Sequence, residues 1–580
     1  MPNTKRPYFD IYPQHHPDQH ALCFFPNNPN KALSANDGGI QKTDNCVLDS
    51  INWTSCNYSY LTSQFYTIAI DHATKQNPVI IGGLQDNGTY MTTGSFPSDF
   101  WEMKLTYDGA FCAIEDNRKS YYMSAQQGRI ARMIIDDQGT IISKGRIDPA
   151  GGTNYLFINP FTLDKTNQNI MYVAGGQILW RNNNLKDMPM GGWDSTSIYW
   201  DSLSYTRLPT GESISAVSST KTTNHILYYG TNKGNLYKII DADKGDPIPI
   251  DITGGKFPIN ANIQNIAIDP RDANKALVVF SNYNVLSMFY TSNGGESWTP
   301  VSGNLEENQS GGGKGPSCRW AQILPVNNGT MYYVGTSVGL FSTSILDSTN
   351  TCWEQEGSNT IGNSVVVMLD AREQEGYVVA ATHGSGVYAS IIFDLPLKAN
   401  SPELISPGID STTTSTTITY RWTSVPNAVF YKLDVSETPD FSTLKLSKSL
   451  ITNTFYTAST GIVVGKSYYW RVQAINSAGA SLAPNSRKFS VKSSTGINED
   501  RDAPIVYISN GILVIKKNDY FDNPEQITYS IYDIVGNCYW TSTMYNNSDA
   551  YINISSYPKG MYIVLSRSEK MTYQSRILFN

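Results

Sequence analysis

Short apolar segments and turn residues alternate along most of the chain. A unit of one apolar strand, a Gly or Asn turn and a second apolar strand recurs, with hydrophobic residues at every second position. Its copies lie at residues 31–43, 78–92, 120–133, 170–182, 226–239, 276–292, 330–343 and 376–390. They are about 50 residues apart, a period that suits one four-stranded propeller blade per copy. We therefore predict an all-β chain in which residues 1–398 form a β-propeller of seven or eight blades.

A tryptophan often follows the unit, and we expect it to fill the space between blades, where a large aromatic side chain buries the most area. These residues are Trp53, Trp101, Trp193, Trp298 and Trp353. One copy continues into a sharper motif, TSNGGESW, which carries Thr291, Asn293, Gly295 and Trp298. Asn293 is expected to bond turn amides, and Gly295 to take a positive φ. The motif resembles the Asp-box (BNR repeat) of sialidase-like and sortilin-like propellers, and we interpret it as a structural turn.

The pattern changes after residue 398. Residues 399–493 contain ITYRWTSVPNAVFYKLDV and KSYYWRVQAINSAGAS, which resemble a fibronectin type III domain, a β-sandwich with Trp422 in its early core. We interpret this domain as a spacer or a weak binding module. Residues 494–503 are polar and are predicted to form a linker.

The last segment, residues 504–580, alternates apolar and polar positions and carries an ordered set of turn residues. Asp533 and Gly536 mark a hairpin turn, and Gly560 precedes a strand with Tyr562. This order resembles the C-terminal sorting domain of the type IX secretion system. The resemblance implies that the secretion machinery is a partner, and that the protein is secreted or attached to the outer-membrane surface. The first 30 residues hold no apolar stretch of signal-peptide length. Since the resemblance implies export, we expect the natural product to have an amino-terminal signal that this sequence lacks.

Composition excludes several classes of function. The 43 Lys and Arg residues against 50 Asp and Glu give a net charge of −7, which argues against a nucleic-acid partner. No run of about 18 apolar residues occurs, so no transmembrane helix is expected. Phosphate-binding loops and the sequence motifs of serine hydrolases and zinc proteases are absent as well.

Several segments of the propeller region share a wider resemblance. They are HPDQHALCFFP, NDGGIQKT, QFYTIAID, GGLQDNGTY and AATHGSGVY. They resemble secreted Bacteroidota propeller proteins of glycosyl hydrolase-like or sortilin-like type, over about residues 12–395. In such relatives more propeller usually lies upstream, so we expect this chain to lack the first blades.

Three aspartates lie in turns of successive blades: Asp37 in NDGG, Asp86 in QDNG and Asp108 in YDGA. Equivalent turns gather at one end of a propeller channel, where two carboxylates could act as the acid and base of an inverting glycosidase. The Asp37 turn also resembles the one that bears a catalytic Asp in xyloglucanase-type propellers. The alternative is that Asp-Gly pairs only form hairpin turns, which need no function.

The histidines suggest a metal site. His16, Asp18 and His20 alternate, so on a strand they face the same side. Imidazole, carboxylate and imidazole on one face could bind a divalent metal or relay a proton. The alternative is a buried hydrogen-bond cluster near the propeller axis. No other cofactor is expected.

Aromatic side chains and one histidine are candidates for a binding surface, because flat rings stack on sugar faces. These candidates are Tyr199, Trp200, Trp320 and His383. The same residue types are also common in propeller cores. The best interpretation is a secreted or surface-attached propeller that binds an extracellular glycan or protein. The alternatives are a xyloglucanase-like glycoside hydrolase with paired Asp acid and base, and a non-catalytic structural or adhesion protein.

Overall fold

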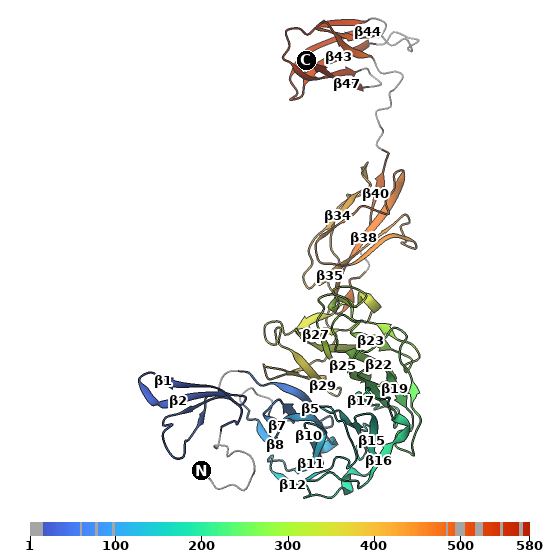
Figure 1. Ribbon diagram of the computed structural model, residues 1–580. Coiled ribbons are helices and arrows are strands. Elements are labelled where there is room, and N and C mark those ends of the chain that lie inside the picture. Colours follow the sequence, from blue (N-terminus) through green and yellow to red (C-terminus); the bar gives the residue numbers. More distant parts are fainter. Residues whose placement is uncertain are drawn as a thin grey trace. The chain divides into compact units, whose positions relative to one another are not determined.

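The computed structural model (Figure 1) describes residues 15–57, 61–75, 79–94, 99–482, 485–493, 505–516, 526–545, 549–567 and 572–580. Over these residues the chain consists of β-strands joined by turns and short 3₁₀ segments. Within the same residues no helix is long and apolar enough to cross a membrane. The linker predicted at residues 494–503 lies outside the described residues.

Each of the eight repeats forms an antiparallel hairpin, because its two alternating strands are joined by a turn or a short loop. The hairpins are β2–β3 (Asn28–Asn36, Gly39–Thr43), β6–β7 (Ile80–Leu84, Gly88–Thr92), β10–β11 (Tyr121–Ala125, Arg129–Ile135), β14–β15 (Met171–Gly175, Ile178–Asn182), β18–β19 (Leu227–Thr231, Leu236–Ile239), β22–β23 (Asp272–Phe280, Met288–Thr291), β26–β27 (Gly329–Thr336, Gly339–Thr343) and β30–β31 (Tyr377–Thr382, Val387–Ile391).

One strand precedes each hairpin, and in all sheets but the last a further strand follows it. The preceding strands are β1 (Gln19–Phe25), β5 (Phe65–Ile70), β9 (Gly109–Ile114), β13 (Phe161–Leu163), β17 (Ile214–Ser219), β21 (Ile263–Asp269), β25 (Cys318–Val326) and β29 (Val366–Arg372). The following strands are β4 (Thr54–Ser55), β8 (Glu102–Leu105), β12 (Ile141–Arg146), β16 (Trp200–Leu203), β20 (Ile250–Asp251), β24 (Thr299–Pro300) and β28 (Glu354–Glu356).

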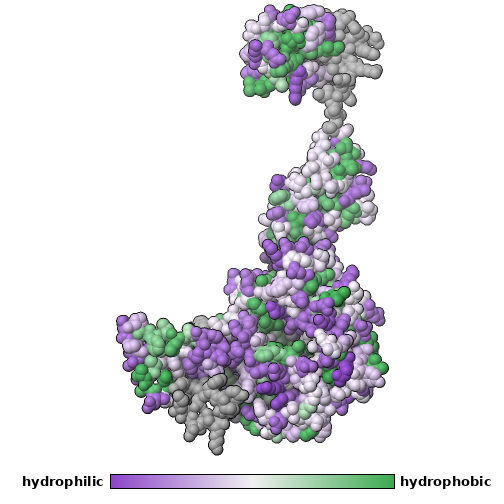
Figure 2. Space-filling view, viewed as in Figure 1, coloured by the Kyte–Doolittle hydropathy of each residue, from purple (hydrophilic) through white to green (hydrophobic). Residues whose placement is uncertain are grey.

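Seven of these sheets close a ring. The preceding strands pack on one another in order from β5 to β29, and β29 and β30 then pack on β5. The first sheet, β1–β4, stands beside the ring (Figure 1). All seven residues of β1 are exposed, whereas β5 is buried over nearly its whole length. Apolar side chains such as Leu22 and Phe24 therefore face solvent on this sheet, whose hydrophobic surface is visible in Figure 2.

Side chains of the last sheet hold the ring closed. The backbone N–H of Ile70 donates to Asp370 Oδ2 at 3.0 Å, and His72 Nε2 lies 2.8 Å from Asp370 Oδ1. Arg372 donates to the carbonyl of Asp71. These bonds satisfy polar groups at the edge of β5, which has no strand partner on that side.

The same device joins other neighbouring blades. A polar side chain on the first strand of one blade bonds a backbone group on the first strand of the next blade. That backbone group thereby gains a hydrogen-bond partner from outside its own sheet. These pairs are Thr67 with Ala110, Ser215 with Ile263, and Asn265 with Ala321.

Two of the five expected tryptophans fill the outer space between blades of the ring. Trp53 instead belongs to the first sheet, beside the ring, where it stacks on His15. The indole N–H groups of Trp298 and Trp353 each donate at 2.9 Å to a carbonyl of the preceding blade. In the fourth sheet Trp200 plays this role, donating to Ile147 at 2.7 Å. The predicted Trp193 instead lies 43% exposed.

Residues 399–493 form two sheets. One contains β32 (Leu404–Ser406), β34 (Ile418–Trp422) and β37 (Phe455–Ala458), and the other contains β33 (Ser411–Thr413), β40 (Arg487–Val491), β38 (Lys466–Asn476), β35 (Phe430–Ser436) and β36 (Leu444–Ile451), with the short β39 (Gly479–Ala480) beside β38. Trp422, which the sequence placed in the core, is buried with its ring centroid 5.5 Å from that of Tyr431.

The last segment also forms two sheets. They contain β41 (Val506–Ser509), β42 (Ile512–Ile515) and β45 (Ala550–Asn553), and β44 (Cys538–Tyr545), β43 (Gln526–Asp533), β46 (Gly560–Arg567) and β47 (Thr572–Phe579). Their inward apolar residues, among them Leu513, Ile531 and Val564, share one core. The chain as a whole divides into two compact units, 1–410 with 417–461 and 468–489, and 411–416 with 462–467 and 490–580.

Candidate functional site

A cavity of about 1110 Å³ lies where the β1–β4 sheet meets the ring. Its walls come from the β2–β3 turn, the β6–β7 turn, the segment before β5, and strand β31. Polar and aromatic side chains line it: Asn36, Asp37, Asn57, Gln64, Gln85, Asp86, Asn87, Tyr90, Trp101, Tyr377 and Tyr388. Ligand pockets of roughly 300–1,000 Å³ commonly hold small molecules, so the volume is ample for one.

The structure brings the three predicted aspartates together at this cavity, but they do not occupy equivalent turns of successive blades. Asp37 and Asp86 lie in the β2–β3 and β6–β7 turns, whereas Asp108 lies in the link from β8 to β9. The backbone N–H of Asp86 donates to Asp108 Oδ1 at 2.9 Å, and Asn87 Nδ2 donates to the Asp37 carbonyl at 2.9 Å. Asp86 itself has φ +58°, a conformation that the tight β6–β7 turn requires and that Asp tolerates better than most residues. Asp37 and Asp86 line the cavity, and Asp108 supports the Asp86 turn.

The grouped carboxylates shape the electrostatics of the site. Burial raises the pKa of Asp86 above its ordinary value, and the negative charges of Asp108 and Asp37 raise it further. Burial, with the same kind of repulsion from Asp108 and Asp86, raises the pKa of Tyr66 to about 12. The upward direction of the Asp86 shift is the one that a general acid needs.

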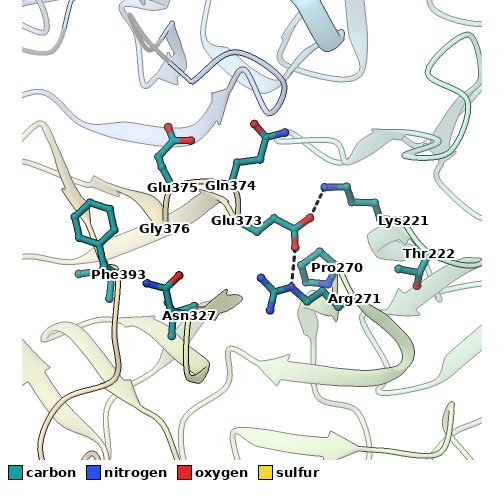
Figure 3. Close-up of a pocket in the computed structure, with 12 residues that line it drawn as sticks. Lys221, Thr222, Pro270, Arg271, Asn327, Glu373, Gln374, Glu375, Gly376 and Phe393 are labelled. Carbon is teal, nitrogen blue, oxygen red and sulfur yellow. Dashed lines mark hydrogen bonds and ion pairs between the residues drawn. The ribbon is translucent and has the colours of Figure 1, made fainter.

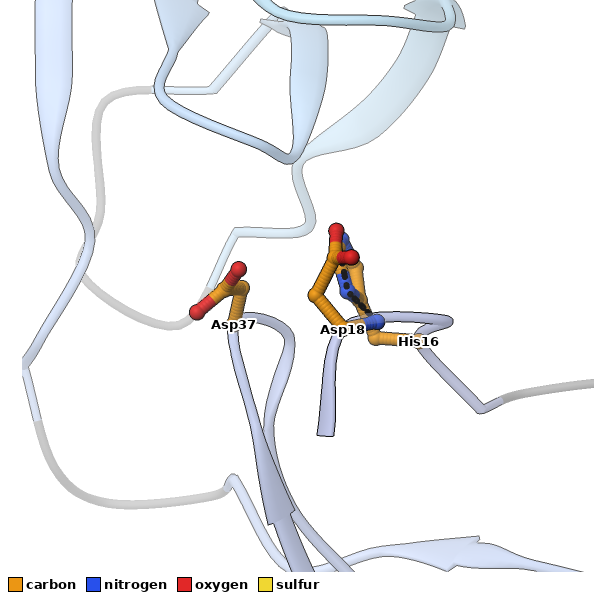
Figure 4. Close-up of side chains that lie close together, drawn as sticks. All are labelled: His16, Asp18 and Asp37. Carbon is orange, nitrogen blue, oxygen red and sulfur yellow. Dashed lines mark hydrogen bonds and ion pairs between the residues drawn. The ribbon is translucent and has the colours of Figure 1, made fainter. Parts of the chain in front are cut away.

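The histidine cluster differs from the sequence expectation in one member. His16 and Asp18 precede β1, so only His20 lies on the strand and the expected alternation does not apply. The ligand atoms of His16, Asp18 and Asp37 all lie within 4.8 Å of one another (Figure 4). His20 instead forms an ion pair with Asp37, which raises the pKa of His20.

The four candidate binding residues lie in different places. Tyr199 is exposed, but it precedes β16 and so lies at the end of the ring opposite the β6–β7 turn. Trp200 is buried between blades. Trp320 packs in the interior, with its ring centroid 6.2 Å from that of Phe111. Only His383 lies near the carboxylates: its ring stacks on Tyr66 at 5.7 Å.

Sequence reasoning missed Asn57, which fixes the turn that carries Asp37. Its Nδ2 donates to the Gly38 carbonyl at 2.7 Å, and its Oδ1 accepts from the Ile40 N–H at 2.7 Å. A side chain at Gly39 would collide with this amide, so the second glycine of the turn is required for a close approach as well as for its φ of +104°. In the sequence, the only indication of the contact between Asn57 and this turn is the pair Gly38 and Gly39.

A second cavity of about 710 Å³ lies at the opposite end of the ring, lined by the turns between the first and second strands of four blades (Figure 3). Glu373 lies between two cations there, with Lys221 Nζ at 2.8 Å and Arg271 Nε at 3.3 Å. The ion pairs keep the pKa of Glu373 low although burial opposes this. The three charges partner one another, so this end of the ring is held by ion pairs.

The Asp-box has the bonds of a structural turn. Thr291 Oγ1 donates to Asn293 Oδ1 at 2.8 Å and accepts from the Gly295 N–H at 3.1 Å. Gly295 has φ +97°. The Trp298 indole is bonded to the preceding blade and does not line the large cavity.

The motif residues of the last segment also build turns. Asp533 Oδ1 accepts from the backbone N–H groups of Val535 and Asn537 at 3.0 and 2.9 Å, and Gly536 has φ +93°. Bonding from Asn537 lowers the pKa of Asp533. Tyr562 is buried, and its hydroxyl donates to the Pro558 carbonyl at 2.6 Å. Gly560 begins β46.

Comparison with known proteins identifies this last segment. Residues 509–580 match the family model of the secretion system C-terminal sorting domain. No curated protein matches the chain. Among solved structures, the GH74 enzyme of Niastella koreensis is similar, with 15% identity, a TM-score of 0.43, and coverage of 65% of this chain and 50% of that one. The Cps50 (Swd1) β-propeller domain of Myceliophteria thermophila has 10% identity, a TM-score of 0.37, and coverage of 56% and 96%.

The chain thus spans about half the length of the GH74 enzyme. Its sorting domain shows that the protein is secreted or displayed at the cell surface, and implies that it engages the type IX secretion machinery. The cavity beside the propeller ring is therefore presented outside the cell.

Proposed function

We propose that this protein is a secreted or surface-attached recognition protein whose cavity binds an extracellular glycan. The observation that supports this proposal is the composition of the cavity wall. Hydrogen-bonding side chains such as Gln64 and Asn87 line it together with the aromatic side chains of Tyr90 and Trp101. Sugars present both hydroxyl groups and apolar C–H faces, so they fit a wall of this kind, which offers a few placed polar groups among aromatic ones.

The carboxylates of the cavity favour a neutral glycan over an acidic one. Asp37 and Asp86 line the cavity, and Asp108 lies directly behind the Asp86 turn. An acidic polysaccharide would bring like charges together, at a cost that grows as water is excluded. We therefore expect a neutral glycan to bind in preference to uronate-rich or sulfated chains.

The test is binding of the purified full chain to neutral and acidic polysaccharides, measured by titration calorimetry. Trp101→Ala should weaken binding of the preferred neutral glycan by about tenfold or more, in line with the loss of a buried aromatic contact. Trp193→Ala is the matched control, because Trp193 is 43% exposed and lies outside the cavity. Absence of binding to every glycan, or an equal effect of both variants, would reject the proposal and favour a protein ligand or a purely structural role.

A second candidate function is glycoside hydrolysis, and the meeting of three aspartate turns at one cavity favours it. An inverting enzyme needs two carboxyl groups about 6.5–9.5 Å apart, and a retaining one needs about 5 Å. Release of new reducing ends by the full chain, lost in both Asp86→Asn and Asp37→Asn, would establish an enzyme. Binding without release would leave recognition as the function.

A further inference from the structure

We propose that His16, Asp18 and Asp37 bind one divalent transition-metal ion at the rim of the cavity. Each residue offers one donor atom, and the three atoms lie within 4.8 Å of one another. Donors about 2.0–2.2 Å from a tetrahedral Zn²⁺ are about 3.4 Å apart, so small side-chain rotations would complete the site. Asp18 can make such a rotation, since its side chain is 66% exposed.

The hydrogen bonds of His16 prepare it as a ligand. Its Nε2 lies 2.9 Å from the Asp86 carbonyl, which can only accept, so Nε2 carries the proton. Nδ1 is then unprotonated, and it faces the Asp18 carboxylate at 3.8 Å. It accepts from the Asp18 N–H at 3.2 Å, a bond that an ion at Nδ1 would replace. Metal-binding histidines are commonly oriented by a bond from the second ring nitrogen to a carbonyl, as here.

The two carboxylates at the rim pair with histidines, His16 and His20. Among the described residues, neither Asp18 nor Asp37 forms an ion pair with a Lys or Arg. The carboxylate of Asp37 has His20 as its partner, so a second imidazole lies beside the cluster. One imidazole with two carboxylates, and a second imidazole beside them, suits Zn²⁺ or Mn²⁺ better than Ca²⁺ or Mg²⁺, which prefer oxygen ligands.

An ion at this place would link two segments of the chain. It would tie the segment before β1 to the β2–β3 turn, next to the Asp86 carbonyl of the ring. Asp18 does not line the cavity, so the metal site is testable apart from any glycan. Asp37 belongs to both the cluster and the cavity, so Asp18→Asn is the variant that distinguishes failure of the metal site from failure of glycan binding.

The test is Zn²⁺ titration of the full chain, purified without a polyhistidine tag and treated with a chelator. We expect one ion per chain at the site, and at least tenfold weaker binding in Asp18→Asn. Asp44→Asn is the matched control, because Asp44 has 68% side-chain exposure, pairs with Lys31 and Lys42 in the same sheet, and lies outside the cluster. It should leave the affinity unchanged.

Exposed free thiols such as Cys23 and Cys538 are competing ligands for Zn²⁺ in a titration, so Co²⁺ spectra provide the second measurement. Co²⁺ at the proposed site has nitrogen and oxygen ligands, and its spectrum should lack thiolate charge-transfer bands. The proposal is overturned if no stoichiometric binding occurs, if Asp18→Asn and His16→Gln bind as the parent does, or if binding disappears only when the exposed cysteines are replaced.

Discussion

Single side chains join the blades of this propeller at its outer side. The indole N–H groups of Trp200, Trp298 and Trp353 reach carbonyls of the preceding blade. A buried carbonyl without a partner costs about 1–3 kcal/mol, so these bonds matter beyond the area that the rings bury. The tryptophan that bonds the preceding blade lies at a different distance from its hairpin in each blade, because the loops before the outer strands vary in length.

We expect Trp353→Phe to lower the free energy of unfolding by about 1–3 kcal/mol, because it leaves the Val301 carbonyl without its donor in a buried place. Chemical denaturation monitored by circular dichroism measures this change. Trp193→Phe is the control and should stay within about 0.5 kcal/mol, as is usual for surface positions. Equal effects of the two substitutions would show that the indole bond contributes little.

At the scale of elements, the decisive feature is the seam between β29 and β5. The ring closes by packing of two sheets about 300 residues apart in sequence, and Asp370 bonds the backbone of β5 across it. Burial alone would raise the pKa of Asp370, but His72, the Ile70 N–H and Lys165 together lower it. A carboxyl whose pKa is lower in the folded state stabilises the fold above its unfolded pKa, and this contribution is lost as the pH falls through its folded pKa.

The seam therefore predicts a pH dependence. Asp370→Asn should be less stable than the parent at neutral pH, by about 1–3 kcal/mol. The parent should lose part of this advantage as the pH is lowered below about 4, since the unfolded carboxyl then binds a proton more readily than the folded one. Thermal unfolding between pH 7 and 3 measures both curves. Parallel curves would contradict the assigned role of the carboxylate.

At the scale of the whole molecule, the sorting domain is built separately from the propeller ring. The sorting domain occupies the last residues, where its hairpin turn around Asp533 and its core are formed without residues of the ring. The net charge of −7 and the acidic cavity both disfavour anionic partners. The sorting domain thus serves export, and the proposed glycan binding is assigned to the cavity beside the ring.

We expect deletion of residues 505–580 to stop surface delivery in a bacterium with the type IX system, because the deletion removes the sorting domain. Surface proteolysis of whole cells and fractionation of the periplasm measure the outcome. Asp533→Ala, which removes the acceptor for two turn amides, should reduce delivery, while the exposed-site variant Asp44→Asn should not. Normal delivery of the deleted chain would show that export uses another signal.

The sequence by itself determined the hairpins and the sorting domain. Alternation of apolar residues and Gly or Asn turns are local properties, and all eight predicted repeats form hairpins. The ordered turn residues from Asp533 to Tyr562 likewise identified the sorting domain. The sequence also selected Asp37, Asp86 and Asp108 as residues of turns that lie together.

Only the tertiary structure decided which sheets form the ring and which candidate metal ligands lie together. The first hairpin has the same local pattern as the others, yet its sheet lies beside the ring, because packing of β29 and β30 on β5 closes seven blades without it. Asp37 joins His16 and Asp18 in place of His20, since the strand begins only at Gln19. Contacts between segments far apart in sequence depend on how whole sheets pack, and no local period records them.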